Sequence, residues 1–140
     1  MIKNIAVVLV CLCTIFSCET KKKYTIDKTI LRSFGAKHRD GYIDRIKSHK
    51  EEIAKDSTHV SDYVSITESN IIMFAFGFMP REHTIPEAKV FQEKAYAMDS
   101  LNSRVQEMAG ILHFMDSEWQ ASEKAFKKSL VLNPENLQAR

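Results

Sequence analysis

The sequence predicts an all-α fold made of antiparallel helix hairpins, and two observations lead to this prediction. Residues 88–100 match residues 122–134 when they are moved by 34 positions, with small residues over small ones and apolar residues over apolar ones. A repeat of this length is typical of helix–turn–helix units that stack, because one unit cannot bury its apolar face alone. Four glycines and three prolines in 140 residues also provide few turns for a β-sheet domain. We therefore expect an α-solenoid of about two full repeats and part of a preceding one.

The spacing of apolar residues and the residues that stop helices place the expected elements in order. Residues 24–34 lack a clear helical period and are expected to form a linker or a short irregular helix. Helices are expected at residues 41–55, 60–79, 86–98, 103–115 and 118–132. Pro80 and Pro86 are expected to bound a loop, and an oxygen of Asp116 or Ser117 is expected to cap the last of these helices. Residues 135–140 have the pattern of the first turn of a further helix, so the repeat domain is expected to be incomplete at its C-terminus.

The first 18 residues have the pattern of an export signal. Lys3 precedes an apolar run, and the three cysteines of the chain all lie in this segment, at Cys11, Cys13 and Cys18. A positively charged start followed by a short apolar stretch is typical of a secretory signal and is too short for a membrane-spanning helix. An ordinary signal peptide, in which Cys18 has no role, is the alternative.

The residues before Cys18 resemble the lipobox of bacterial lipoproteins. Ile15 stands three places before the cysteine and Ser17 directly before it, although Phe16 is larger than is usual there. The resemblance implies cleavage between Ser17 and Cys18 and acylation of the Cys18 thiol, which would anchor the protein on the periplasmic side of an envelope membrane. It divides the chain into a signal peptide at residues 1–17, a tether or linker at 18–34 and a helical repeat domain at 35–140. Display on the cell surface stays open.

The repeated segments resemble tetratricopeptide (TPR) repeats. In that family, bulky and small residues alternate at set positions, so that neighbouring helices approach closely where a small residue lies. The residues at these positions, which the resemblance implies are packing residues, are Ala88, Ala95, Gly110, Trp119, Phe126, Ser129 and Pro134. Residues 76–140 are further similar to repeats of bacterial signalling proteins, where such repeats accompany cyclase, kinase or DNA-binding modules that are not recognisable in this chain.

The same resemblance implies a protein-binding surface. The first helix of each unit lines the concave side of such stacks, and the candidate partner-binding residues there are Arg104, Glu107, Met108, Ile111 and Phe78. Phe126 and Leu130 lie on the last full helix, with no capping helix after it. We therefore expect that the chain is a fragment of a longer repeat protein, or that a partner or a second copy covers this face.

Other classes of function find little support in the sequence. The 20 lysines and arginines stand against 18 acidic residues, far from the basic excess of a nucleic-acid-binding protein. The five histidines are scattered without metal-ligand spacing, and no nucleophile, phosphate-loop or dinucleotide-binding motif occurs. The sequence therefore predicts no metal site, no cofactor and no nucleic-acid partner, and a protein that is not an enzyme.

The leading prediction is a lipid-anchored scaffold that binds other proteins at the bacterial cell envelope. One alternative is the sensory or regulatory part of a larger signalling protein whose effector module is absent from this chain. A second alternative is a periplasmic enzyme of unrecognised type, which the lack of clustered acids, bases or nucleophiles disfavours.

Overall fold

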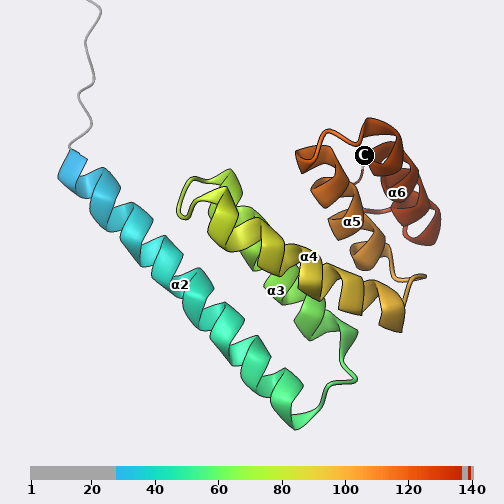
Figure 1. The fold of residues 1–140 in the computed structure, drawn as a ribbon, viewed down its shortest axis with the longest axis horizontal. Coiled ribbons are helices and arrows are strands. Elements are labelled where there is room, and N and C mark those ends of the chain that lie inside the picture. The colour runs from blue at the N-terminus through green and yellow to red at the C-terminus, as the bar shows by residue number, and fades with distance from the viewer. Residues whose placement is uncertain (1–27, 137–138, 140) are drawn as a thin grey trace, which may run out of the picture.

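The structure, a computed structural model, describes residues 28–136 and 139, with the side chains of residues 28–32 and 34 outside the description. Within this part of the chain the fold is all-helical and contains no strand, as the sequence predicts. The helices are α2 (Lys28–Lys55), α3 (Val60–Ala75), α4 (Arg81–Met98), α5 (Ser103–Met115) and α6 (Trp119–Leu132) (Figure 1). The expected signal peptide, its cleavage site at Ser17 and the expected lipidation site at Cys18 lie outside the described residues.

The helices form a row of antiparallel neighbours. The most extensive packing joins α3 to α4 and α5 to α6, while α2 lies along α3. Contacts of α5 with α3 and α4 join the two hairpins to each other. Figure 1 accordingly shows α2 along one side of the molecule and the α5–α6 hairpin at the other. None of the described helices is long and apolar enough to cross a membrane.

The main apolar core lies where the α3–α4 hairpin meets α5. Its buried members are Tyr63, Val64, Ile71, Ile85, Ala88, Ala95, Val105, Met108 and Leu112. A second, smaller cluster is formed by Ile46, Ile66 and Met73 and joins α2 to α3. Since removing apolar surface from water is the main favourable term in folding, these two clusters hold the row of helices together.

Both hairpins turn through the same backbone corner. Gly77 after α3 has a φ of 69° and Ser117 after α5 has a φ of 62°, both in the left-handed region. In each corner the following residue donates its backbone N–H to a carbonyl five positions earlier, at 2.8 Å and 2.9 Å. This is the Schellman ending of a helix, which glycine adopts without steric cost. The corners place the ends of α3 and α5 in equivalent positions, 40 residues apart.

The prediction of a loop between Pro80 and Pro86 is wrong, because α4 begins at Arg81 and contains Pro86. The ends of α4 and α6 are 34 residues apart, as the sequence repeat indicates. Because the ends of α3 and α5 are 40 apart, the first hairpin contains six additional residues. Four of them lengthen α4, which has 18 residues against 14 in α6. The other two lie in the connection, at residues 76–80 compared with 116–118.

Other helix bounds also differ from the expected ones. α3 ends at Ala75, four residues earlier than expected, and α2 begins at Lys28, so residues 28–34 are helical within the stretch expected as a tether. The expected cap of α6 is wrong as well. The residue that precedes this helix is Glu118, no side chain caps the helix, and Asp116 instead binds basic residues of α4. α5, by contrast, begins and ends as predicted, with the Asn102 side chain accepting from the backbone N–H groups of its first turn.

Candidate interaction surfaces

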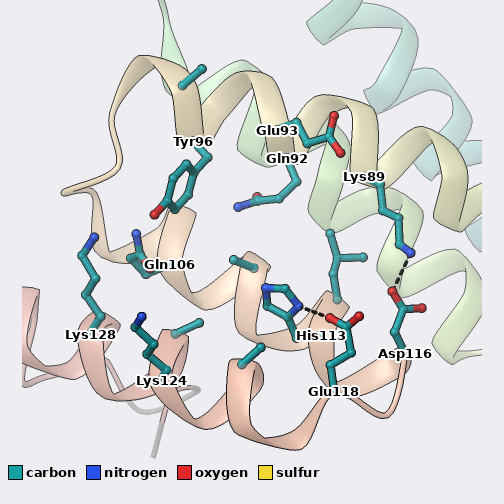
Figure 2. Close-up of a pocket in the computed structure, with 15 residues that line it drawn as sticks. Lys89, Gln92, Glu93, Tyr96, Gln106, His113, Asp116, Glu118, Lys124 and Lys128 are labelled. Carbon is teal, nitrogen blue, oxygen red and sulfur yellow. Dashed lines mark hydrogen bonds and ion pairs between the residues drawn. The ribbon is translucent and has the colours of Figure 1, made fainter.

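A groove lies between α4, α5 and α6, and the close-up in Figure 2 shows its lining. Its volume is about 780 Å³. The lining residues that the argument uses share small size at the floor or charge at the rim, and they are Ala97, Ala109, Ala121, Ala125, Leu112, Lys89, Tyr96, Gln106, His113, Asp116, Glu118, Lys124 and Lys128. The volume falls in the range of pockets that hold small molecules or the side chains of a bound peptide.

The floor of the groove is made of small apolar side chains. Four alanines from three helices line it, together with Leu112. Ala125 and Leu112 are buried, whereas Ala109 and Ala121 are half-buried and Ala97 is exposed. Because an alanine projects only one carbon from its helix, the space between the three helices is left for the side chains of another segment.

The rim of the groove carries charge of different character at its two ends. At one end Asp116 binds Lys89, and His113 Nδ1 lies 2.6 Å from Glu118 Oε2. At the other end Figure 2 shows Tyr96, Gln106, Lys124 and Lys128 close to one another. Of these, Lys128 Nζ lies 5.8 Å from the centre of the Tyr96 ring. Among the described residues no acidic side chain forms an ion pair with Lys124 or Lys128, so this end offers hydrogen-bond donors and positive charge.

Asp116 connects the groove to both hairpins. Hydrogen bonding from Lys89 lowers the pKa of the Asp116 carboxyl below its ordinary value of 3.8, against the opposing effect of burial, and the Arg81 guanidinium adds to the lowering. Arg81 Nη2 donates to Asp116 Oδ1 at 2.6 Å. Since both basic residues belong to α4 and Asp116 follows α5, this ion-pair cluster fixes the position of one hairpin relative to the other.

One buried polar group in the wall of the groove lacks a partner. The Gln92 side chain is 5% exposed, and its Nε2 donates to the backbone carbonyl of Val105 at 2.8 Å. Gln92 Oε1 is buried and accepts no hydrogen bond from the described residues. A buried oxygen without a donor is costly, so the wall of this groove is not fully satisfied in the unbound chain.

A second arrangement lies on the surface that the resemblance implies is concave, where a polar network joins three helices. Arg104 Nη1 donates to both carboxylate oxygens of Glu107, at 2.8 Å and 2.9 Å, and Nη2 donates to Glu68 Oε1 at 2.7 Å. Arg45 Nη2 donates to the other oxygen of Glu68 at 3.3 Å. Partial burial lowers the pKa of Arg104, but Glu68 and Glu107 raise it more, so the pKa lies above its ordinary value. The network therefore joins α2, α3 and α5.

The segment after α6 closes this network. Asn136 Nδ2 donates to Glu107 Oε2 at 2.7 Å and to Ser129 Oγ at 2.9 Å. Asn136 and Ala139 are both buried, although the expected first turn of a further helix would have left this region exposed. The residues after α6 thus pack against α5 and α6.

The burial of the predicted partner-binding residues corrects part of that prediction. Glu107 is 0% exposed and Met108 1% exposed, so neither offers a surface to a partner. Arg104 and Ile111 are half-buried, and Ile111 packs against the main core. Phe78 does not lie on the first helix of a unit, because α3 ends at Ala75 and Phe78 follows in the turn.

Most of the predicted packing residues do pack between helices. Ala88, Ala95 and Ser129 are 0% exposed, and a Cβ added to Gly110 would lie 2.8 Å from the Phe126 ring. Trp119 differs, because 59% of it is exposed, and Pro134 is also exposed. The Trp119 ring contacts Phe114 edge-on at 5.2 Å between centroids. No described helix follows α6, so nothing covers the outer side of its first turn.

These two aromatic residues begin a second, shallower groove along α5 and α6. Its volume is about 430 Å³, and its apolar lining residues are Phe114, Trp119, Phe126, Leu130 and Ala139. Val131, on the same helix, is 81% exposed. This is the face that the sequence identifies as uncovered, and the residues after α6 fill only one end of it.

The comparisons with known proteins leave the chain on its own. No known family model matches this chain, and no curated protein matches it. Within the described residues no group of three or more histidine, cysteine, aspartate or glutamate side chains is placed to hold a metal ion.

Sequence reasoning did not find the groove between α4, α5 and α6. Its residues come from two repeats and from both helices of the second, so no single periodic segment contains them. Alanines on three helices together with Lys124 and Lys128, four residues apart on α6, were the available indication.

Proposed function

We propose that this protein is a lipid-anchored scaffold of the TPR type that binds other proteins at the bacterial cell envelope. The match between residues 88–100 and 122–134, the lipobox-like residues before Cys18 and the row of antiparallel hairpins support this proposal. The shared corners at Gly77 and Ser117 add support, because they indicate that the two hairpins are variants of one unit.

The groove between α4, α5 and α6 is the observation that carries the binding role. It is open along its length, small at its floor and charged at its rim, which suits a peptide segment better than a compact small molecule. A segment with small or medium apolar side chains would contact the alanines. Acidic residues at one of its ends would meet Lys124 and Lys128, since these ammonium groups have no acidic partner among the described residues.

Photo-crosslinking in the bacterial host tests this binding role. A photoreactive residue at Lys124 is expected to capture a protein that is not captured from Gln120, which is exposed on the same helix and outside both grooves. The captured protein is then purified and its Kd measured. Ala121→Arg, which fills the groove, should weaken binding at least about tenfold, or 1.4 kcal/mol. Gln120→Arg adds the same charge outside the groove and should leave binding unchanged. Equal affinity for the two variants, both folded by circular dichroism, would reject the groove as the binding site.

The anchor is tested separately from the groove. Mass spectrometry of the N-terminal peptide is expected to show an acylated Cys18 as the first residue, and Cys18→Ser should abolish both acylation and processing. An intact Met1, or an unmodified peptide that begins elsewhere, would remove the lipoprotein part of the proposal and leave the scaffold part standing.

The second groove supports a proposal of self-association through the α6 face. Phe114, Trp119 and Val131 are all more than half exposed there. Burying a Val or a Trp side chain contributes about 1.5–3 kcal/mol, enough to draw two copies together at high concentration. Sedimentation velocity of the detergent-solubilised protein should show a dimer that Val131→Glu disperses, and a concentration-independent monomer would refute this.

A further inference from the structure

We propose that the end of the molecule formed by the first half of α2 and the α3–α4 turn rests on an anionic membrane surface, with Phe76 inserted among the lipid headgroups. The inference deepens the proposed lipid anchor, because it states how the helical domain is oriented once the anchor holds it. It is carried by an exposed aromatic cluster, by the distribution of charge along the chain and by the path of the chain.

The aromatic cluster lies between α2 and the α3–α4 turn. The Phe78 ring is stacked on His38 at 6.1 Å, on Tyr42 at 6.4 Å and on Phe76 at 5.9 Å between centroids. Phe78 and Tyr42 are half-buried, but Phe76 is 72% exposed. Aromatic side chains are enriched at the interface between a membrane and water, where an exposed ring leaves the aqueous phase. Phe76 is thus an exposed ring supported from below by other rings.

The backbone holds this cluster in place. Gly77 provides the left-handed corner, and the backbone N–H of Phe78 donates to the carbonyl of Met73 at 2.8 Å. Because the turn is fixed by these bonds and by ring stacking, inserting Phe76 into a lipid surface would cost little conformational entropy. A flexible loop of the same composition would lose more on insertion.

Charge is distributed unevenly along the chain, and this favours a lipid surface over a protein partner. Residues 19–39 contain seven basic and two acidic residues, whereas residues 40–140 contain twelve basic and sixteen acidic ones. Lys37 and Arg39 within the first group are exposed next to the cluster. Anionic headgroups attract the first part of the chain and repel the rest, so electrostatics alone orient the molecule with this end toward the lipid.

The path of the chain brings this end close to the expected anchor. Lys28 follows Cys18 by ten residues, which span at most about 35 Å when fully extended. His38 lies a further ten residues on, about 15 Å along α2. Figure 1 shows the start of α2 and the α3–α4 turn on one side of the molecule and the α5–α6 hairpin on the other. The cluster is therefore the exposed apolar feature of the described domain that lies nearest in chain path to Cys18.

The test measures the depth of single tryptophans in lipid vesicles that carry the full-length protein. Trp119 is the one tryptophan of the chain and is replaced by Phe, and the protein then receives a probe as Phe76→Trp. Val131→Trp in the same background is the matched control, because Val131 is 81% exposed on α6, far from the cluster. The vesicles are of phosphatidylcholine with or without phosphatidylglycerol, with bromine atoms on the acyl chains as quencher.

The probe at position 76 is expected to shift its emission to shorter wavelength and to lose most of its intensity to brominated lipid in vesicles with phosphatidylglycerol. Added salt should reduce both effects, and the probe at position 131 should show neither. Absence of quenching at position 76, or equal quenching at the two positions, would overturn the proposal. Shielding of the probe at position 76 by an envelope protein fraction, with none by pure lipid, would also overturn it and assign the cluster to a protein partner.

The two proposals fail in distinguishable ways. If Cys18 carries no acyl group but the probe at position 76 is quenched, the anchor is wrong and the membrane-facing end stands. If Cys18 is acylated and the probe at position 76 is not quenched, the domain is tethered without a fixed orientation.

Discussion

Replacement of Arg104 by methionine tests whether the network across α2, α3 and α5 stabilises the fold. The substitution keeps an apolar stem of similar length but removes the guanidinium that binds both oxygens of Glu107. The Glu107 side chain is fully buried, so its carboxylate would lose a bidentate partner inside the protein. Removing one partner of a buried ion pair typically costs about 3–5 kcal/mol. Because 38% of the Arg104 side chain is exposed, solvent screens part of this pair, and we expect a loss of about 2–3 kcal/mol.

Three further variants separate this electrostatic cost from a general effect of mutation. Arg104→Lys keeps the charge without the forked geometry and should cost about 1 kcal/mol. The double variant Arg104→Met, Glu107→Met removes both charges and should recover most of the lost stability, since apolar replacements of a buried pair are often neutral. Arg45→Met is the matched control, because Arg45 is half-exposed and makes a single bond of 3.3 Å to Glu68, so its loss should cost less than about 1 kcal/mol.

The assay is urea unfolding of the purified protein at pH 7, followed by far-ultraviolet circular dichroism. Midpoints and slopes together give the free energy of unfolding, and an unchanged slope shows that the unfolding transition is the same. A loss for Arg104→Met no greater than that for Arg45→Met would refute the reasoning. Additive effects of Arg104→Met and Glu107→Met in the double variant would refute it as well, because the two residues would then act independently.

Three other predictions follow from the packing of the hairpins, each measured by the same unfolding assay. Gly110→Ala should destabilise by about 1–2 kcal/mol, because the added Cβ lies 2.8 Å from the Phe126 ring, and the loss should become a gain when Phe126 is also replaced by Ala. Ser117→Gly should stabilise and Gly77→Ala should destabilise, each by about 1 kcal/mol, because both positions have a positive φ, and effects of the same sign would show that these corners are not equivalent. Asp116→Asn should cost about 1 kcal/mol at pH 7. Because the pKa of Asp116 is lowered in the folded protein, its contribution is present above its ordinary pKa and is lost as pH falls through the folded value. The difference between wild type and Asp116→Asn should therefore shrink on acidification, and a constant difference would contradict this.

The sequence was sufficient for the helices whose ends carry local signals. α5 lies between Asn102, which caps it, and Asp116, which follows its last residue, and its bounds were predicted correctly. α4 was misjudged because Pro86 was taken as a helix start. Thr84 and Ile85 before it are 0% and 3% exposed, and burial of these side chains holds the first turn helical despite the hydrogen bond that Pro86 cannot make. This stabilisation comes from tertiary contacts, which a local pattern does not contain.

The predicted site failed for a related reason. An alignment at 34 residues carries α4 onto α6, but α3 and α5 align at 40, so the positions inferred for the concave face were shifted on the first hairpin. Phe78 was placed on a helix for this reason and lies in a turn. Arg104 and Glu107 are three residues apart on one helix, so their pairing was foreseeable. Their contacts with Glu68 and Asn136 depend on the packing of separate segments and were not.

The two proposed surfaces are compatible because they lie on different helices. A membrane surface at the start of α2 would engage the end of the chain that is basic and aromatic, and the groove would remain open on α4, α5 and α6. The ion pairs of Asp116 with α4 and of Arg104 with Glu68 join the hairpins between these surfaces. A partner bound in the groove would then be held at a fixed height above the lipid, at a distance set by the row of helices and not by the tether. Weakening either ion-pair cluster should therefore loosen the position of the partner without affecting the anchor.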